Sequence, residues 1–501
     1  SSCFEFAASQ HQPQPVCCTR GSTWCVLSFE GSSAFRSHYS QLDMRRHLLK
    51  GLARAARSQP SSRTAKNVQS RFVSSSAGLK SSAMPAIAQT SSIAQEFIDR
   101  EDRYGAHNYH PLPVVLSRGE GVKVWDVEGK QYYDFLSAYS AVNQGHCHPK
   151  ILDALVKQSS TLSLTSRAFY NNVLGDYEEY ITKLFGFDRV LPMNSGVEGG
   201  ETAIKLARRW GYDVKGIAPD QARIVFAAGN FWGRTLAAIS SSTDPSSYSG
   251  FGPKMPNFDM IPYNDLEALE AKLIADPNVA GFFVEPIQGE AGVVIPQEGY
   301  MAKVQALCKK HNVLLIADEV QTGLCRTGKM LCCDHDDVKP DILILGKALS
   351  GGTYPVSAVL TSNEVMLQLK PGEHGSTYGG NPVAAAVGMA ALKVLVDEKL
   401  AENSTKIGAQ LLAGLQEMQR DMPMVTAVRG KGLMCAVVIK EMGQVNAWEV
   451  CMALRDNGML AKPTQGDTIR LAPPLVITAA QMDECIQIIR TTLQSFAGAY
   501  K

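Results

Sequence analysis

The stretch "DILILGKALSGG", residues 341–352, joins the pattern of a buried strand to a lysine. Its four consecutive apolar residues, 342–345, form a run of strand length that is apolar on both faces, which is typical of a strand inside a parallel sheet. A glycine and then Lys347 follow directly. A lysine there has two explanations: it lies on a solvated loop, or it is a nucleophile at the mouth of a pocket. The stretch alone leaves both open.

Further apolar runs of strand length occur elsewhere in the chain and alternate with helical patterns. They are "RIVFAA" (223–228), "VAGFFVEP" (279–286) and "VLLIAD" (313–318). Continuous apolar strands that alternate with helices predict an α/β fold with a mainly parallel sheet covered by helices on both faces. The segment "VKVWDVEGKQYYDF" (122–135) alternates around a Glu-Gly turn and predicts a hairpin.

The composition excludes several classes of protein. Apolar residues make up 45% of the 501 residues, charged residues 19%, and the net charge is +1, so nothing favours nucleic-acid binding. The segment "PVAAAVGMAALKVLV" (382–396) carries a lysine and is too short to span a membrane, so it predicts a buried helix. The twelve cysteines include no Cys-x-x-Cys, and "HCHP" and "CCDH" lack zinc spacing. We therefore expect free thiols, no metal site and no membrane or nucleic-acid partner.

The chain divides by composition into a leader and a globular part. Residues 1–90 form a basic leader rich in Ser and Arg, whose segment 44–58, "MRRHLLKGLARAARS", is amphipathic. Such a leader predicts mitochondrial targeting, and the alternative is a disordered extension of a cytoplasmic protein. The globular part is expected to comprise an N-terminal segment (91–140) that packs with the small domain, a large domain (141–390) and a smaller α/β C-terminal domain (391–501). The last contains the alternating segments "LMCAVVIK" and "TIRLAPPL".

Charged residues stand at the ends of three predicted strands. Glu285 follows "FFV", Asp318 follows "LLIA", and Lys347 follows "LILG". Ligands of an open α/β sheet bind beyond the carboxyl ends of its strands, so these residues predict one site. No Gly-x-Gly-x-x-Gly or P-loop pattern follows a strand, whereas a lysine with a carboxylate fits a Schiff base to pyridoxal phosphate (PLP), the carboxylate facing the pyridinium nitrogen.

A phosphate site is also expected for PLP. The segment "MNSGVEGGETAIKLARRW" (193–210) supplies a turn with Gly196 and then a helical pattern. Free backbone N–H groups at a helix start bind phosphate. An ordinary loop-to-helix junction would have the same sequence, so this segment alone decides nothing.

Longer motifs identify a family. The segments "LLIADEVQTGLCRTG" (314–328) and "PDILILGKALSGG" (340–352) resemble the signature of class III (ω-) aminotransferases, PLP enzymes of fold type I. The narrower resemblance is to the members that act on ornithine, and it extends from about residue 96 to the C-terminus. It runs through "YGAHNYHPLPVVL", "SAYSAVNQGHCHPKI", "LTSRAFYNN", "AAGNFWGRTLAAISSSTDP", "VEPIQGEAGV", "GEHGSTYGGNP", "RDNGMLAKPT" and "IRLAPPLVI".

The resemblance implies roles for the residues that would hold the cofactor. Lys347 would form the Schiff base and then shuttle the proton, Asp318 would pair with the pyridinium nitrogen, and Gln321 would bond the ring hydroxyl oxygen. The remaining implied contacts are stacking on the ring by Phe231, backbone donors to the phosphate from Gly196 and Val197, and contacts of Ser376 and Thr377 with the phosphate of a neighbouring subunit. The last contact implies a homodimer with shared active sites.

The resemblance also implies a device for binding two substrates in turn. Arg234 would clamp the α-carboxylate of L-ornithine and Tyr109 would bond its α-amine, which places the δ-amine at the cofactor. Arg470 would take the α-carboxylate of 2-oxoglutarate, and Glu290 would neutralise that arginine while ornithine is bound. Tyr139 would narrow the pocket against 4-aminobutyrate, with core packing as its alternative role. For Glu285 two roles remain open: support of the site, or simple capping of a strand end.

The implied activity is transfer of the δ-amino group of ornithine to 2-oxoglutarate, in two half-reactions. The alternatives are another ω-aminotransferase, which acts on acetylornithine or 4-aminobutyrate, and a PLP aminomutase. An aminomutase would turn over without 2-oxoglutarate. A PLP-binding protein without activity conflicts with the presence of both Lys347 and Asp318.

Overall fold

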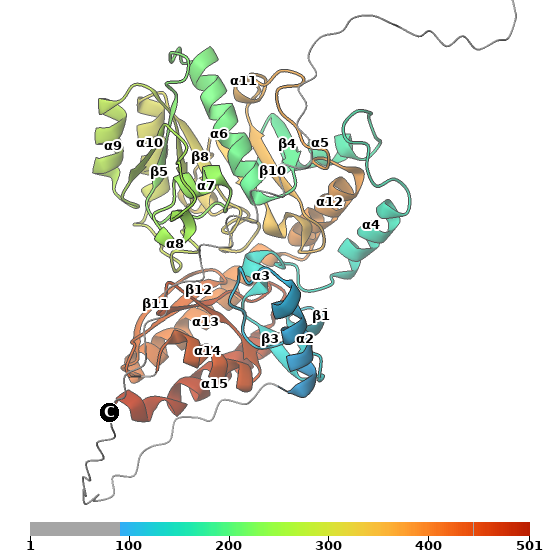
Figure 1. The fold of residues 1–501 in the computed structure, drawn as a ribbon, viewed down its shortest axis with the longest axis vertical. Helices are drawn as coiled ribbons and strands as arrows, with labels where there is room; N and C mark the ends of the chain where they lie inside the picture. The colour runs from blue at the N-terminus through green and yellow to red at the C-terminus, as the bar shows by residue number, and fades with distance from the viewer. Residues whose placement is uncertain (1–90, 444, 501) are drawn as a thin grey trace, which may run out of the picture. The chain divides into compact units, whose positions relative to one another are not determined.

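The structure is a computed structural model that describes residues 91–443 and 445–500. The predicted leader, residues 1–90, lies outside the described residues. The described residues fold around three sheets (Figure 1). No helix among them is long and apolar enough to cross a lipid bilayer.

The largest sheet has seven strands and is mainly parallel, which confirms the predicted fold class. Only β10 runs against its neighbours, pairing antiparallel with β4 and with β9. The predicted strands in residues 223–228, 279–286, 313–318 and 342–345 are all present. In sheet order the strands are β4 (Arg189–Met193), β10 (Ser357–Thr361), β9 (Ile342–Leu345), β8 (Leu314–Asp318), β7 (Val279–Val284), β5 (Arg223–Ala227) and β6 (Phe258–Ile261).

Helices cover both faces of this sheet because successive strand side chains point to opposite faces. In β9, Ile342 and Ile344 pack in the core beneath α6, whereas Leu343 and Leu345 pack in the core that includes α12. The predicted buried helix is α12. The helical elements of this part are α4 (Pro149–Ser159), α5 (Leu174–Phe185), α6 (Gly196–Asp213), α7 (Leu236–Ser240), α8 (Pro245–Tyr248), α9 (Leu266–Ala275), α10 (Tyr300–Lys310), α11 (Asn363–Met366), α12 (Pro382–Asp397) and the 3₁₀ turns η1 (Cys333–Asp336) and η2 (Lys347–Ser350).

The C-terminal part contains a four-stranded antiparallel sheet, which includes both predicted strands. Its order is β11 (Val425–Lys431), β12 (Met434–Ile439), β15 (Thr468–Leu471) and β14 (Lys462–Thr464). The helical elements of this part are α13 (Leu400–Asp421), α14 (Ala447–Asp456), α15 (Ala479–Ser495) and η3 (Ala497–Tyr500).

A third sheet joins the N-terminal segment to the C-terminal part. The predicted hairpin is confirmed: β2 (Lys123–Asp126) and β3 (Gln131–Asp134) pair antiparallel. β1 (Leu116–Glu120) extends the hairpin, and β13 (Met459–Leu460) pairs parallel with β3. α2 (Ser92–Tyr104) precedes this sheet and α3 (Ser137–Ser140) follows β3. The domain boundaries at residues 90, 140 and 390 stay predictions.

Candidate active site

Three adjacent strands bring the predicted charged residues to one edge of the large sheet. β7, β8 and β9 are neighbours and parallel, so their carboxyl ends meet at the same edge. Asp318 is the last residue of β8, Glu285 follows β7 directly, and Lys347 follows β9 after a single glycine. Both carboxylates lie close enough to act electrostatically on the Lys347 amine.

Burial dominates the titration of these groups, because a buried group loses solvation of its charged form. Burial lowers the pKa of Lys347, and the charge of Arg470 adds to this effect. Burial raises the pKa of Asp318 to about 6, although the Val320 N–H and Lys347 oppose the change. Burial and the charge of Asp318 raise the pKa of Glu285 to about 8. The same edge of the sheet therefore holds an amine whose pKa is lowered, Lys347, and two carboxyl groups whose pKa values are raised, Asp318 and Glu285.

The backbone that presents Lys347 is unusual. Lys347 itself has a φ of 44°, a region that is strained for a side chain of its size. Gly351 and Gly352 also have positive φ, and a Cβ on Gly352 would lie 2.3 Å from a methyl group of Val142. The tight turn expected at this glycine pair is confirmed, and it lets the segment after Lys347 approach residues 141–144.

The start of α6 supplies backbone donors beside Lys347. Ser195 and Glu198 form a capping box, which uses the N–H groups of these two residues. The N–H groups of Gly196 and Val197, in the first turn, are left outside the hydrogen bonding of the helix itself. Gly196 and Lys347 line a cavity of about 350 Å³ together with Asn194, Ser195, Ser350 and residues of the 352–356 loop.

Phe231 and Arg234 line a second cavity, of about 430 Å³, with Glu290. The guanidinium of Arg234 lies 5.6 Å from the centre of the Phe231 ring and donates a 3.2 Å hydrogen bond to the Ser247 hydroxyl. The Phe231 N–H donates a 2.9 Å hydrogen bond to the Glu285 carboxylate, which also accepts from the N–H of Gly289. Of the two expectations for Glu285, these contacts favour support of the site.

Glu290, Gln321 and Arg470 form one polar cluster. Arg470, on β15, donates from Nη1 to Glu290 Oε1 at 3.0 Å and to Gln321 Oε1 at 2.9 Å. The Gln321 Nε2 completes the cluster by donating to Glu290 Oε1 at 3.3 Å. Burial opposes ionisation of Glu290, but Arg470 and Lys347 outweigh it and hold the pKa of Glu290 below its ordinary value. The predicted ion pair is therefore formed in its charged state.

A glycine makes room for this cluster. A Cβ on Gly289 would lie 2.1 Å from the Oε1 atom of Gln321. Any larger residue at position 289 would push the Gln321 amide away from Arg470. The glycine in "QGEAG" is the sequence signal for this contact, but only the fold shows what it faces.

Tyr139 lies against the same arginine. Its ring centre is 5.0 Å from the guanidinium carbon of Arg470, a cation–π geometry. Burial, followed by the charge of Glu290, raises the pKa of the Tyr139 hydroxyl. Tyr139 stands on α3, where all four residues, 137–140, have positive φ between 46° and 69°. The element is thus a left-handed turn, a conformation that L-residues other than glycine rarely adopt in succession.

The remaining predicted residues lie further from this cluster. Tyr109 is 72% exposed and lines neither cavity, although His110 beside it stacks on Trp448 at 4.4 Å. The Ser376 hydroxyl accepts a 2.8 Å hydrogen bond from Asn194, and Thr377 is exposed. Tyr109 nevertheless lies close enough to Tyr139 for its charge to raise the pKa of the Tyr139 hydroxyl, whereas Thr377 lines neither cavity of this chain.

Sequence reasoning missed four residues that shape the site: Asn143, Asn194, Gly289 and Arg326. Asn194 lines the cavity beside Lys347, and Gly289 admits Gln321. Asn143 and Arg326 are buried and hydrogen-bonded to each other. Both lie inside quoted family segments, "SAYSAVNQG" and "GLCRTG", but a polar residue in a segment gives no sign of its distant partner.

The residues present fit the expected cofactor. Lys347 and Gly196 line one cavity, Asp318 stands at the neighbouring strand end, and the first turn of α6 offers the N–H groups of Gly196 and Val197. These are the amine, anion and phosphate donors that PLP requires. Among the described residues no group of three or more His, Cys, Asp or Glu is arranged to hold a metal ion.

Comparisons with known proteins give a consistent result. Residues 104–493 match the family model described as Aminotransferase class-III. The chain is 65% identical over 404 residues to the protein of Rattus norvegicus named "Ornithine aminotransferase, mitochondrial", which covers 80% of this chain and 91% of that protein.

Solved structures agree with this match. The crystal structure of the ornithine aminotransferase from Toxoplasma gondii ME49 matches with a TM-score of 0.79 at 49% identity, over 80% of this chain and 95% of that chain. The structure of an acetylornithine aminotransferase from Elizabethkingia anophelis matches with a TM-score of 0.74 at 57% identity, over 80% of this chain and 99% of that chain.

Proposed function

The chain belongs to the class-III aminotransferase family, and from that premise we propose that it transfers the δ-amino group of L-ornithine to 2-oxoglutarate. The products are glutamate and glutamate 5-semialdehyde, which cyclises to pyrroline-5-carboxylate. The protein is a PLP-dependent transaminase. Its cofactor supplies an electron-accepting ring that carries the amino group from one substrate to the other.

We assign the cofactor-side roles as follows. Lys347 Nζ binds the cofactor and then moves a proton to and from the substrate carbon, and its lowered pKa favours the neutral amine that accepts this proton. In the bound state Asp318 would pair with the ring nitrogen, Gln321 would bond the ring hydroxyl, and Phe231 would stack on the ring. Gly196 and Val197 would donate backbone hydrogen bonds to the phosphate. The strand-end position of Asp318 and the capping box before α6 support these assignments.

The observation that carries the substrate assignment is the 3.0 Å ion pair between Glu290 and Arg470. While Glu290 and Arg470 are paired, they present little net charge to a carboxylate. The α-carboxylate of ornithine therefore binds Arg234, at the edge of the second cavity. The δ-amine of ornithine then points toward Lys347. Tyr109 contacts the ornithine α-amine. When 2-oxoglutarate enters, Glu290 turns away and Arg470 takes the α-carboxylate. Tyr139, which packs on Arg470, narrows the pocket and favours ornithine over 4-aminobutyrate.

One comparison favours a second candidate. The 57% identical structure from Elizabethkingia anophelis is named an acetylornithine aminotransferase, so N-acetylornithine is the rival amino donor. Acetylation turns the charged α-ammonium into a neutral, bulkier amide with a single N–H, which weakens the contact with Tyr109. The ratio of kcat/KM for ornithine to kcat/KM for N-acetylornithine therefore separates the two candidates.

The test is an assay of the purified protein with PLP and 2-oxoglutarate. Ornithine, N-acetylornithine and 4-aminobutyrate serve as donors, and trapped pyrroline-5-carboxylate and glutamate are measured. We expect ornithine to be used best and both products to form in equal amounts. Preference for either other donor contradicts the substrate assignment, and sustained turnover without 2-oxoglutarate identifies an aminomutase.

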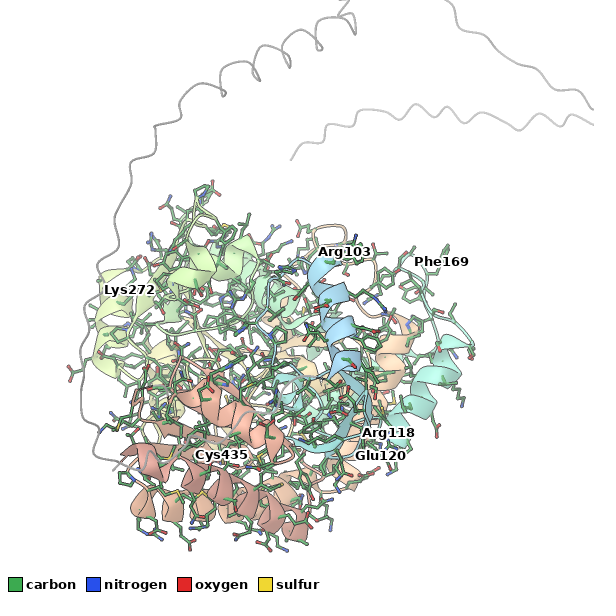
Figure 2. The ribbon with its side chains drawn as sticks, turned by 60° about the horizontal axis from the view of Figure 1, so that its bottom comes forward. Arg103, Arg118, Glu120, Phe169, Lys272 and Cys435 are labelled. Atoms are coloured by element: carbon green, nitrogen blue, oxygen red, sulfur yellow. The ribbon has the colours of Figure 1, made fainter. Side chains whose placement is uncertain are left out.

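We also propose that the protein works as a homodimer in which Ser376 and Thr377 reach the phosphate site of the partner. The side chains of Phe169 and Tyr170, on the loop before α5, are exposed and support an interface on this part of the chain. Figure 2 labels Phe169 on this loop. Sedimentation of the PLP-loaded protein tests the assembly. A catalytically active monomer would contradict it.

A mitochondrial location is the last part of the proposal. It is supported by the composition of residues 1–90 and by relatives whose names include "mitochondrial". Fusing residues 1–90 to a fluorescent protein tests it, with a fusion in which Arg46, Lys50, Arg54 and Arg57 are changed to Gln as the control. Diffuse cytoplasmic fluorescence of the unchanged fusion would contradict the location.

A further inference from the structure

Arg326 is a completely buried arginine whose hydrogen-bond partners come from three different segments. Its Nη1 atom donates to the backbone oxygens of Leu433, at 2.9 Å, and of Pro473, at 2.6 Å. Its Nη2 atom donates to the side-chain oxygen of Asn143 at 2.5 Å. All of these partners are neutral, so the guanidinium is not held by a direct ion pair. Burial of a charge among neutral acceptors is unfavourable, so a structural arginine is an unexpected choice here.

The segment of Arg326 itself and the segments of two of its partners, Pro473 and Asn143, each carry a residue of the proposed substrate site. Arg326 follows Gln321 on the loop after β8. Pro473 follows Arg470 just after β15, and Asn143 follows Tyr139 after the left-handed turn. The Arg470 side chain contacts both Gln321 and Tyr139. Through its hydrogen bonds, Arg326 thus connects the chain segments that carry Gln321, Arg470 and Tyr139.

Asn143 extends this connection. Its side-chain nitrogen donates a 2.8 Å hydrogen bond to the Leu324 oxygen, on the loop of Arg326, and its backbone oxygen accepts from the Leu475 N–H. The left-handed turn is fixed at its other end by Asp134, whose Oδ1 accepts the N–H groups of Leu136 and Ser137 at 2.8 and 2.9 Å. Residues with strained φ angles persist only where neighbouring contacts hold them.

We propose that Arg326 is a positioning residue that sets the distance between Tyr139 and Arg470 and so tunes the affinity for the dicarboxylate substrate. The planar guanidinium fork reaches acceptors on separate segments at fixed angles, which a single ammonium group cannot do. The effect on affinity for the dicarboxylate rests on the proposed function. The control of the distance between Tyr139 and Arg470 does not.

The test compares Arg326→Lys with Arg223→Lys, both in the full chain with PLP. Arg223 is also a hydrogen-bonded arginine, but it lies at the start of β5, at the edge of the sheet opposite the strand ends that carry the site. We expect Arg326→Lys to raise the KM for 2-oxoglutarate about tenfold or more, because displacement of a binding group by about 1 Å has large effects. Cofactor absorbance should stay unchanged, since Lys347 and Asp318 are not bonded to Arg326. Arg223→Lys should lower Tm without changing either KM.

A wild-type KM for 2-oxoglutarate in Arg326→Lys overturns the proposal, and so does an equal rise in Arg223→Lys. If Arg326→Lys does not fold, Asn143→Ala tests the proposal instead, because it removes only the Asn143 partner of Arg326. It should raise the same KM, and an unchanged KM overturns the proposal.

A crystal structure of the soluble variant gives a readout that does not depend on turnover. The distance from the Arg470 guanidinium carbon to the Tyr139 ring centre is 5.0 Å in the unchanged protein. We expect it to change by about 1 Å in the variant, and an unchanged distance overturns the proposal. Failure of the wild-type protein to use ornithine or 2-oxoglutarate would instead contradict the proposed function, and the crystallographic distance would still decide the role of Arg326.

Discussion

Glu290 and Arg470 form an ion pair whose two partners differ in exposure: the arginine side chain is 3% exposed and the glutamate side chain 25%. The arginine is fixed in β15 by the sheet, whereas the glutamate comes from the loop after β7 and borders the second cavity. The pair can therefore open by movement of the glutamate alone. This asymmetry is what a switch between two substrates requires.

Replacing Glu290 by Ala should leave Arg470 permanently available. We expect kcat/KM for glutamate, relative to ornithine, to rise about tenfold, equivalent to about 1.4 kcal/mol. Steady-state kinetics of both half-reactions measure this ratio. Glu290→Gln is the matched control, because it keeps an oxygen for the Arg470 hydrogen bond and removes the charge; its ratio should lie between those of the wild type and Glu290→Ala. A ratio that stays at the wild-type value in both variants would rule out the switch.

Replacing Lys347 by Ala should abolish turnover, because Lys347 is the amine that the strand ends place beside Asp318 and Glu285. We expect kcat to fall by at least about 10³-fold and the absorbance of the lysine-bound cofactor to disappear. Lys347→Arg keeps the positive charge but not a neutral nucleophilic amine, so it should be equally inactive. Substantial activity in either variant would end the assignment.

Asp318 should make cofactor binding depend on pH. With the pKa of Asp318 raised to about 6, its carboxylate is charged above that pH and favours a protonated ring nitrogen. As pH falls through about 6 the charge is lost, and the affinity of the cofactor-free protein for PLP should fall with it. Asp318→Asn should bind PLP more weakly at pH 8 and lose this part of the pH dependence. The affinity for PLP of the wild type and of Asp318→Asn is measured by fluorescence titration at several pH values. The same pH dependence in both proteins would contradict the expectation.

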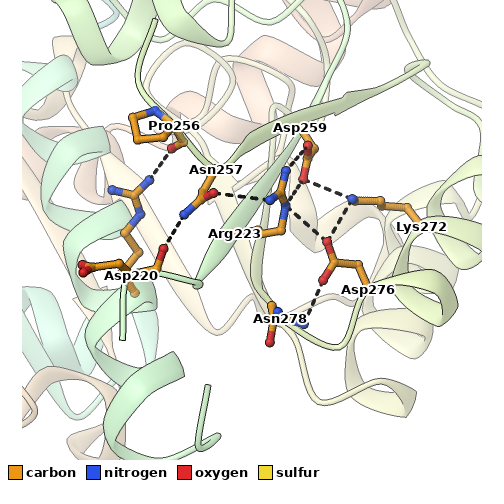
Figure 3. A network of polar contacts seen from close by, with 9 residues as sticks. Asp220, Arg223, Pro256, Asn257, Asp259, Lys272, Asp276 and Asn278 are labelled. Atoms are coloured by element: carbon orange, nitrogen blue, oxygen red, sulfur yellow. Dashed lines mark hydrogen bonds and ion pairs between the residues drawn. The ribbon is translucent and has the colours of Figure 1, made fainter. Parts of the chain in front are cut away.

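A network at the start of β5 should affect stability without affecting the site (Figure 3). Arg223 contacts Asp259 and Asp276, and Lys272 contacts the same two carboxylates. The hydrogen bond from Arg223 outweighs burial and lowers the pKa of Asp259.

A lowered carboxyl pKa stabilises the fold above the unfolded value, about 4, and this stabilisation is lost as pH falls through the folded-state pKa. Asp259→Asn should therefore cost about 1 kcal/mol at pH 7, as expected for partly exposed ion pairs. The difference in Tm from the wild type should narrow toward pH 3, while KM values stay unchanged. A constant difference from pH 7 to pH 3 would contradict the electrostatic explanation.

The sequence predicted those parts of the site that depend on local pattern. Asp318 and Lys347 follow apolar strands, and parallel neighbours bring their ends together without further information. The Gly196 turn was recognisable because a helical pattern follows it. These features need only the order and direction of the strands.

The remaining parts depend on contacts between distant segments. Arg326 bonds to residues more than a hundred positions away in the sequence, mostly to backbone oxygens, which every residue has. The left-handed turn at residues 137–140 opposes the local preference of its serines, alanine and tyrosine, so no propensity argument would find it. The exposure of Tyr109 is likewise a property of the fold and not of its segment.

The left-handed turn has a consequence for how this enzyme could be altered. Glycine adopts positive φ freely, so Ala138→Gly would relieve strain in the folded state, yet it would also release the backbone that aims Tyr139 at Arg470. The same glycine would also widen the choice of conformations in the unfolded chain. The strained backbone at residues 137–140 thus contributes to substrate selectivity by holding Tyr139 in place. Variants that accept a wider range of substrates should therefore arise from backbone changes at Ala138, a residue whose side chain does not touch the substrate.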